Sequence, residues 1–295
     1  MRKLTRGEQI FNIFNVLFLF LMIVISIYPM LYVFFAAFST PSAYMRQGGN
    51  KLLFCPVGFS LASFKAVFKN PSIWTGYGST IFILAVGVPI NIVFTMIGAY
   101  VLSRKQLRIR RFLSLLILFT MYFSGGMIPI YLNVRNFGLD GSLWALIIPN
   151  AINTFNLIIM RTAFEEVPDS LEEAAKLDGA SQLTILFKIM VPLVVPTIAV
   201  LILYYAVYHW NSWFNAMLFI HKREKYPLQL ILRELIIQNS SIFSSELSTS
   251  GAEDEMISET IKYATIVVAT VPILAAYPFL QKYFVKGIMV GAVKG

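Results

Sequence analysis

The sequence has 295 residues, of which 57% are hydrophobic and only 13% are charged, whereas charged residues make up about 25% of an ordinary soluble domain. The apolar residues are gathered in runs of about 20 or more, so the bilayer is expected to be the solvent for most of the chain. A single cysteine, Cys55, excludes an intrachain disulfide and a cysteine-based zinc site. His209 and His221 are too far apart to share one metal-binding helical face, and no metal site is predicted.

The positions of the charged residues mark six candidate transmembrane spans. A Lys, Arg, Asp or Glu at mid-bilayer costs about 3 kcal/mol on insertion scales, so long charge-free runs mark the segments that can cross. A helix needs about 20 apolar residues to cross about 30 Å of hydrocarbon. The predicted spans are about 11–38, 77–102, 112–132, 142–163, 190–220 and 261–282. We therefore expect an all-α membrane protein with six transmembrane helices in a single domain over residues 1–295.

Lysine and arginine residues predict the orientation of these spans, because they are concentrated in cytoplasmic loops. The short loop 104–111 holds five positive residues and no acid. It therefore favours cytoplasmic N- and C-termini, with a cytoplasmic loop at 164–190 and an external loop at 221–259. The net charge of +9 is then explained by topology and by contact with anionic membrane lipids, and no nucleic-acid partner is expected.

The loop between the fourth and fifth spans has the local signals of a short helix. Pro168 ends the preceding helix, and Ser170 with Glu173 three residues later matches a capping box. A helix is therefore expected to begin at Leu171. Glu172 and Glu173 would then offer carboxylates to a basic partner.

A tight turn and a second helix are expected after this first one. The pair Asp178 and Gly179 predicts a turn in which the glycine takes a positive φ. Ser181 is a suitable N-cap for a second short helix that leads towards the fifth span. The adjacent residues Ala174 and Ala175 leave a surface with little side-chain bulk, which another protein could approach closely.

This loop contains a motif that carries a family resemblance. The motif is the run Glu173-Ala174-Ala175-x-x-Asp178-Gly179-Ala180, followed by Pro192 twelve residues later. It resembles the EAA loop of bacterial ABC-importer permease subunits. One departure is that many such loops have a further glycine where this chain reads Ser-Gln-Leu-Thr at 181–184.

Other stretches resemble the carbohydrate-uptake branch of that family, of maltose and oligosaccharide type, on the side of the second permease and near the polysaccharide and aldouronate permeases. These stretches are residues 70–74, 123–129, 209–213, 281–287 and 291–295. The resemblance covers nearly the whole chain. It implies a binding-protein-dependent ABC permease core in the bacterial cytoplasmic (inner) membrane.

The resemblance also implies partners. The chain would form, with a second homologous permease, the translocation path for an oligosaccharide or polysaccharide fragment. Residues 169–190 would couple it to a cytoplasmic ABC ATPase dimer, which would bind the ATP and Mg²⁺, so no cofactor is expected in this chain. An extracytoplasmic solute-binding protein would contact the external loop, and the tail 287–295 would lie against the ATPase pair.

The same resemblance assigns roles within the loop. Glu173 would face a basic ATPase residue, and Gly179, after Asp178, would form the turn. The close contacts with the ATPase would come from Ala174, Ala175 and Ala180.

Aromatic and amide residues around the fifth span are candidates for the path of the sugar, because aromatic faces stack on sugars and amides both donate and accept hydrogen bonds. The candidates are Tyr208, His209, Trp210, Asn211, Trp213 and Asn215, together with Asn153 and Asn156. The alternative is that these residues form an interfacial belt or hold helices together. His209 fits a structural donor better than a proton carrier, because no intramembrane carboxylate is available to relay with it.

Two other classes of function compete with a transport permease. A secondary transporter or channel with no ATPase would be expected to carry intramembrane charges for ion coupling, and none lies in the six charge-free runs. A membrane enzyme would need paired carboxylates, a metal cluster or a nucleophile with a base, and no catalytic residue of this kind is recognisable. The sequence also has no G-x-x-x-x-G-K-S/T motif, so ATP would be bound by another polypeptide.

Overall fold

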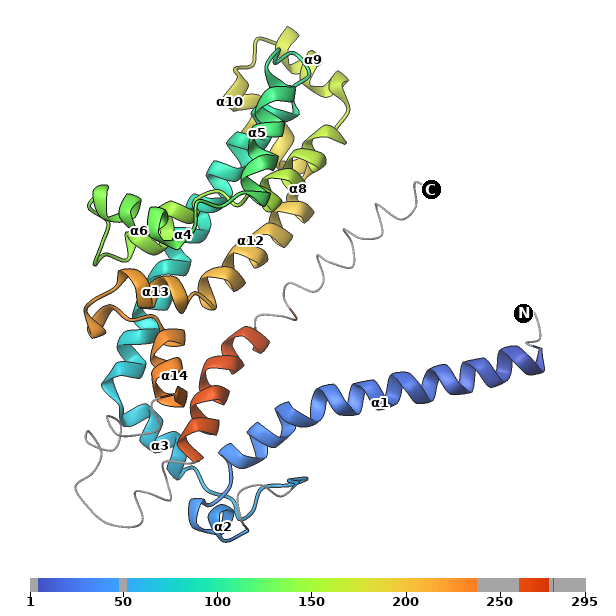
Figure 1. The fold of residues 1–295 in the computed structure, drawn as a ribbon. Coiled ribbons are helices and arrows are strands. Elements are labelled where there is room, and N and C mark those ends of the chain that lie inside the picture. The colour runs from blue at the N-terminus through green and yellow to red at the C-terminus, as the bar shows by residue number, and fades with distance from the viewer. Residues whose placement is uncertain (1–4, 48–51, 238–259, 276–277, 279–295) are drawn as a thin grey trace. The chain divides into compact units, whose positions relative to one another are not determined.

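The computed structural model describes residues 5–47, 52–237, 260–275 and 278. The described residues are mainly helical, and their only β contact is an isolated bridge between Ser39 and Phe59. The chain divides into two compact units (Figure 1). Unit 1 comprises Met1–Pro71 and Glu234–Val271, and unit 2 comprises Ser72–Arg233 and Pro272–Gly295.

Helix α1 (Arg6–Ala37) matches the predicted span 11–38 in unit 1. It begins at a capping box in which the Thr5 hydroxyl accepts from the Glu8 N–H and the Glu8 carboxylate accepts from the Thr5 N–H at 2.7 Å. The helix continues through Pro29 to a total of 32 residues. Most of its large apolar side chains are exposed within the chain, as expected of a helix that faces lipid or another helix.

The rest of unit 1 is held together by a small polar cluster. Its helices are α2 (Pro41–Arg46), α3 (Ala62–Lys69) and the helix Thr260–Ala275. The Tyr44 hydroxyl donates to that of Tyr263 at 3.1 Å and lies 2.8 Å from the hydroxyl of Tyr32. Ser63 also donates to Thr260 at 2.8 Å. These bonds join α1, α2 and α3 to the helix Thr260–Ala275.

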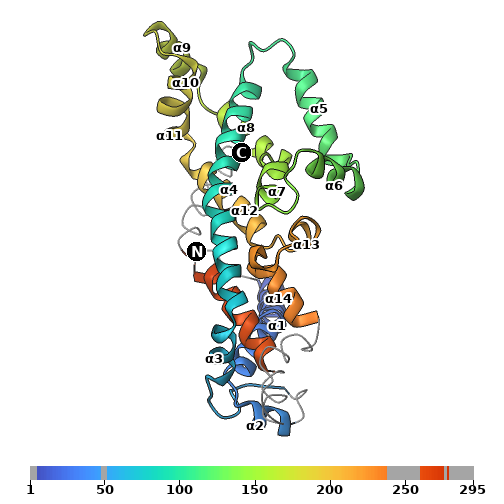
Figure 2. The ribbon, with the colours of Figure 1, turned by 90° about the vertical axis from the view of Figure 1, so that its left-hand side faces the viewer.

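Unit 2 is built around the long helix α4 (Pro71–Ser103). The helices that follow are α5 (Arg110–Tyr122), α6 (Met127–Asn136), α7 (Trp144–Ile147), α8 (Thr154–Glu165), α9 (Asp169–Leu177), α10 (Gln182–Thr184), α11 (Val191–Leu193), α12 (Val195–Trp210), α13 (Phe214–Phe219) and α14 (Leu228–Ile237). In both views α9 and α10 lie at the end of α4 that leads into α5 (Figure 1 and Figure 2).

Helix α12 packs very closely on α4. A Cβ added at Gly87 of α4 would lie only 3.0 Å from His209 Nε2, so a larger residue at this position would push the two helices apart. The apolar core at the α9 end of unit 2 is made by Met96, Ala99 and Tyr100 of α4, Phe164 of α8, Ala175 of α9, Ile185 and Leu186, and Leu201 and Tyr205 of α12. One core therefore joins the predicted coupling loop to α4 and α12.

A π-helical segment connects α10 to α11. It spans Ile185–Met190 and precedes Pro192. Proline has no N–H, and its ring clashes with the carbonyl four residues earlier in a regular α-helix. Widening the helix to the π form just before Pro192 relieves that conflict.

The predicted spans are only partly continuous helices. By length and composition α1 and α4 could each cross a membrane, and the count among the described residues rises to four if each of two bent helix pairs is one span. The predicted span 112–132 corresponds to α5 and α6, bent by 114°. The predicted span 190–220 meets a bend of 88° at Val194, and α12 ends at Trp210.

The predicted span 142–163 is not a single helix, which corrects the prediction. It consists of α7, a 3-10 turn over Ile148–Asn150, non-helical residues and α8. Residues 276, 277 and 279–282 of the sixth predicted span lie outside the described residues. Six remains a prediction for the number of spans.

Candidate functional site

Helix α9 begins earlier than predicted. Its N-cap is Pro168, with an extended ψ of 130°, and the first helical residue is Asp169. No side chain caps this end, so the predicted capping box of Ser170 and Glu173 is wrong. Proline fixes φ at a value compatible with helix entry, and Asp169 places negative charge at the positive end of the helix dipole. Both effects favour a start two residues before Leu171.

The predicted turn after α9 is confirmed. Gly179 has a φ of +79°, which only glycine adopts without strain. Its N–H donates to the carbonyl of Lys176, and the N–H of Ala180 donates to the carbonyl of Ala175, each at 3.0 Å. These two bonds form a Schellman motif, which closes the end of α9. Ser181 then caps α10 through its hydroxyl, also as predicted.

The residues predicted to couple this loop to an ATPase do not all face solvent. Glu173, Ala174, Asp178 and Gly179 are exposed, Ala180 is half-buried and Ala175 is buried in the core. Ala175 therefore packs α9 onto unit 2. The sequence reading missed the apolar part of this surface: Leu177 is 89% exposed. We refer to five exposed residues as the docking face: Leu171, Glu173, Ala174, Leu177 and Leu183.

Glu172 does not offer its carboxylate outward, which corrects the prediction made for it. Its side chain is 7% exposed and forms ion pairs with Arg104 and, at 2.7 Å, with Lys176. The Arg104 guanidinium also lies 4.7 Å from the centre of the Tyr100 ring. Burial lowers the pKa of Arg104, because removal from water disfavours the charged form, although an arginine stays protonated at neutral pH.

Other basic residues of loop 104–111 also pair with acidic residues of α8 and α9. Lys105 lies 2.7 Å from Asp169, with both side chains exposed, and its hydrogen bond lowers the pKa of that carboxyl. Arg110 and Arg161 both bind Glu165. The positive charges of this loop, on which the topology prediction depends, therefore also form ion pairs within the fold.

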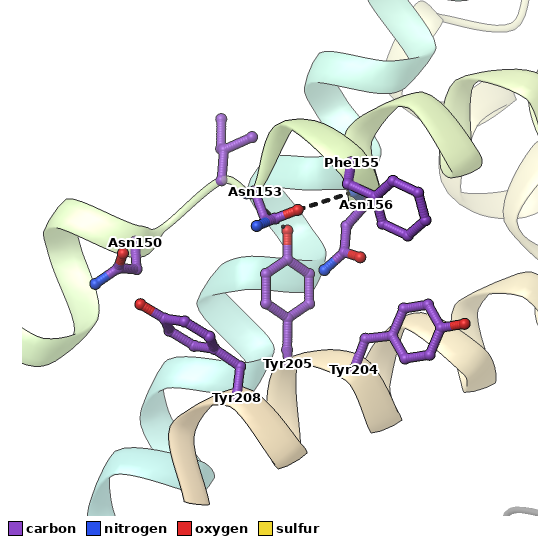
Figure 3. A pocket seen from close by; sticks show the side chains of 8 residues that line it. Asn150, Asn153, Phe155, Asn156, Tyr204, Tyr205 and Tyr208 are labelled. Carbon is purple, nitrogen blue, oxygen red and sulfur yellow. Dashed lines mark hydrogen bonds between the residues drawn. The ribbon is translucent and has the colours of Figure 1, made fainter. Parts of the chain in front are cut away.

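A second candidate site is a cavity of about 300 Å³ between the start of α8 and helix α12 (Figure 3). Its lining consists of Asn150, Ile152, Asn153, Phe155, Asn156, Tyr204, Tyr205 and Tyr208. The polar groups are amides and phenols, and none of the lining residues is charged. Figure 3 shows Tyr205 and Tyr208 extending from α12 towards the segment that carries the asparagines.

Tyr205 fixes one wall of this cavity. Asn153 is the N-cap of α8, and its side chain accepts from the N–H of Asn156 at 3.1 Å. The N–H of Asn153 itself donates to the Tyr205 hydroxyl at 3.0 Å. That hydroxyl also lies 2.6 Å from Thr95 Oγ1 on α4. Tyr205 thus ties α12 to α4 and to Asn153, the N-cap of α8.

Asn91 of α4 supports the chain break before α8. Its Nδ2 donates to the carbonyls of Asn150 and Ala151, at 2.7 and 3.0 Å. Its Oδ1 lies 2.7 Å from Nε2 of the buried His209. A carbonyl oxygen only accepts, so His209 donates here, as expected of a structural residue. The Asn91 side chain thus replaces the helical hydrogen bonds that the carbonyls of Asn150 and Ala151 lack.

The predicted path residues fall into two groups. Tyr208, Asn153 and Asn156 line the cavity, whereas His209, Trp210, Asn211, Trp213 and Asn215 do not. Trp210 is buried with its ring 6.5 Å from that of Tyr77, and Asn211 donates to its own helix. Trp213 lies beneath the guanidinium of Arg233, at 4.6 Å. His209 and Trp210 are buried, so the packing alternative fits these two. A sugar contact for Asn211, Trp213 and Asn215 stays a prediction.

The spacing of the lining residues in the sequence agrees with their placement around one cavity. Tyr204 and Tyr208 are four residues apart, which places them on one face of a helix. Asn150, Asn153 and Asn156 recur at a spacing of three. Among the described residues, no group of three or more His, Cys, Asp or Glu side chains could hold a metal ion.

Comparison with known proteins identifies the family. Residues 55–290 match the family described as "Binding-protein-dependent transport system inner membrane component". The chain is 40% identical to the polygalacturonan/rhamnogalacturonan transport system permease protein YtcP of Bacillus subtilis, over 98% of this chain and 99% of that protein. It is 41% identical to Protein LplC of the same organism, over 99% and 97% of the two chains.

A solved structure agrees with this assignment. It is the crystal structure of a bacterial ABC transporter involved in the import of the acidic polysaccharide alginate, and one of its chains matches with a TM-score of 0.87 and 36% identity. The match covers 96% of this chain and 100% of that one. The chain therefore belongs to the family of binding-protein-dependent transport system inner membrane components, and it is a permease subunit of an ABC importer and not an enzyme.

Proposed function

We propose that this permease carries a fragment of a complex polysaccharide, with an acidic oligosaccharide as the first substrate to test. The neutral cavity of amides and phenols carries this proposal. Amides and hydroxyls both donate and accept, which suits sugar hydroxyls and carboxylates, and aromatic rings suit sugar faces. The relatives named for polygalacturonan and alginate transport favour an acidic sugar.

The cavity would contact only a short part of such a substrate. Ligand cavities in proteins measure about 300–1,000 Å³, and this one lies at the lower end of that range. A second homologous permease would supply the other wall of the path. An extracytoplasmic solute-binding protein would deliver the sugar, in keeping with the family description.

The docking face would bind a cytoplasmic ABC ATPase dimer that holds the ATP and Mg²⁺. Glu173 offers an exposed carboxylate for a basic residue, and Leu177 offers exposed apolar surface. Exposed apolar groups of this size on a cytoplasmic helix are typical of a protein contact. Ala174, Asp178, Gly179 and Ala180 would complete the contact around the turn.

We also propose six spans with both termini in the cytoplasm of a bacterial cell. Helices α1 and α4, the two bent pairs, the α7 to α8 segment and the helix that starts at Thr260 would make up the six. The broken segments are compatible with a membrane because buried side chains such as Asn91 satisfy the freed carbonyls.

Purification of the native complex through a tag on this chain would test these proposals together. We expect a second permease and an ATPase to co-purify. After reconstitution into liposomes with the receptor, we expect ATP-dependent uptake of oligogalacturonides and no uptake of neutral malto-oligosaccharides of equal length. A chain that transports without ATP, driven by an ion gradient, would instead support a secondary transporter or channel. Uptake of the neutral sugar alone would overturn the acidic substrate.

A further inference from the structure

The cytoplasmic end of α4 holds both helices of the coupling loop. Arg104, the first residue after α4, pairs with Glu172 of α9. Tyr100, one turn earlier, donates from its hydroxyl to Gln182 Oε1 of α10 at 2.7 Å. The Tyr100 ring also lies under the Arg104 guanidinium, 4.7 Å from its centre. One turn of α4 therefore contacts the helix on each side of the Gly179 turn.

The Arg104 side chain is fixed in a single orientation. Its Nε and Nη2 donate to the Ser103 hydroxyl at 3.0 and 2.8 Å, while Nη1 pairs with Glu172. The Ser103 hydroxyl in turn donates to the Tyr100 carbonyl at 2.8 Å. The paired side chains are only 16% and 7% exposed, so salt screens this pair far less than a surface pair.

The same helix contacts residues that line the cavity. Asn91, which supports the chain break before α8, precedes Tyr100 by nine residues, a distance of about 14 Å along a helix. Thr95 lies between them and contacts the Tyr205 hydroxyl that holds the Asn153 N–H. Because α4 is one continuous helix here, a displacement of its cytoplasmic end reaches these two contacts without passing through a loop.

We infer that Arg104 and Tyr100 are positioning residues that clamp the coupling loop to α4 and carry its movement to the cavity. The inference rests on the proposed docking of residues 169–190 on the ATPase. The clamp assigns a role in transport to a basic loop whose charges otherwise indicate topology and form ion pairs within the fold. The exposed pair of Lys105 and Asp169 joins the same two segments without burial, which makes it a matched control.

The test uses the assembled complex in liposomes with its receptor. Variants Arg104→Gln, Tyr100→Phe and Lys105→Gln are compared for ATPase bound per permease, basal ATP hydrolysis, and sugar transported per ATP hydrolysed. Arg104→Gln should keep the ATPase bound but lower sugar per ATP at least fivefold. Tyr100→Phe, which keeps the ring and loses one hydrogen bond, should lower it about twofold. Lys105→Gln should leave it unchanged.

A charge exchange provides the rescue. The double variant Arg104→Glu with Glu172→Arg should recover more sugar per ATP than either single variant, because it restores an ion pair. A purely structural role predicts less assembled complex with a normal ratio in what remains, and that result would overturn the clamp. If Arg104→Gln fails to assemble, an unchanged ratio in Tyr100→Phe overturns it instead.

A separate variant distinguishes this failure from failure of the proposed docking. Leu177→Glu changes only the docking face and should reduce the ATPase that co-purifies. If Leu177→Glu binds the ATPase normally, the docking proposal fails and the clamp fails with it. If Leu177→Glu loses the ATPase while Arg104→Gln keeps a normal ratio, only the clamp fails.

Discussion

Asn91 of α4 joins two other parts of unit 2, the chain break before α8 and helix α12. It satisfies the carbonyls of Asn150 and Ala151 and pairs with His209. Inside a membrane no water is available to replace these bonds. Asn91 of α4 thus supports the chain break before α8. This role cannot be inferred from the sequence of α4 alone.

Replacement of this amide should destabilise the protein. Asn91→Leu would leave two carbonyls and the His209 ring nitrogen unpaired, at about 1–3 kcal/mol for each unsatisfied group. We expect a lower melting temperature of the purified complex, measured by tryptophan fluorescence. Asn211→Leu, at an exposed amide that bonds only its own helix, is the control and should change it little. Equal melting of the two variants would contradict the role of Asn91.

The cavity residues should affect substrate affinity without affecting assembly. Tyr208→Phe and Asn156→Ala each remove one neutral hydrogen-bonding group, worth about 0.5–1.5 kcal/mol, so half-saturation of uptake should rise about two- to tenfold. Trp213→Phe, outside the cavity, should leave it unchanged. The measurement is uptake against sugar concentration, normalised to complex content. An effect of Trp213→Phe equal to that of Tyr208→Phe would move the path away from the cavity.

At the scale of elements, the turn between α9 and α10 sets how the docking face is presented. Gly179→Ala meets no steric clash, since no atom lies within 4 Å of an added Cβ, but it retains the positive φ. The expected cost is about 1–2 kcal/mol. Less ATPase should therefore co-purify than with wild type, as measured by the subunit ratio in purified complexes.

Gly179→Asn is the control for this prediction. Asparagine tolerates the left-handed conformation better than alanine. The asparagine variant should therefore retain more ATPase than the alanine variant. The reverse order would show that the side chain, and not the backbone conformation, disturbs docking.

The sequence predicted elements well where the signal is local. Charge-free runs located α1 and α4, and the cap at Ser181 and the turn at Gly179 depend on residues within a few positions. Besides the nearby Lys176, Glu172 pairs with Arg104, 68 positions away, and the amide that supports the break at Ala151 is 60 positions away. No local pattern reveals such pairs, which is why the break within 142–163 and the internal role of Glu172 were missed.

At the scale of the whole molecule, topology is the property most open to a direct test. An impermeant thiol reagent should label native Cys55, which is exposed, from outside intact cells. With Cys55→Ser as background, a cysteine at Ser181 should be labelled only after the membrane is opened. This expectation follows from the basic loop 104–111 and its pairing with α8 and α9 on one side.

Two labelling results would contradict the proposed topology. If Ser181→Cys reacts as fast in sealed cells as in opened ones, the coupling loop is external. The number of spans assigned before it would then be wrong. Labelling of Cys55 only after opening would invert the orientation instead. A cysteine at Lys222, in the proposed external loop, should behave like Cys55 and provides an independent check.

The π-helical segment Ile185–Met190 has a consequence for how the length of this family can vary. A π turn holds one residue more than an α turn. Deleting one residue from this segment would therefore narrow it to the α form and leave the facing of α10 and α11 unchanged, but it would restore the clash between Pro192 and the carbonyl four residues earlier. A single deletion within α12 would instead rotate everything beyond it by about 100°. Homologues that differ by one residue between Gly179 and Pro192 are accordingly expected to present the residues that correspond to the docking face in the same direction.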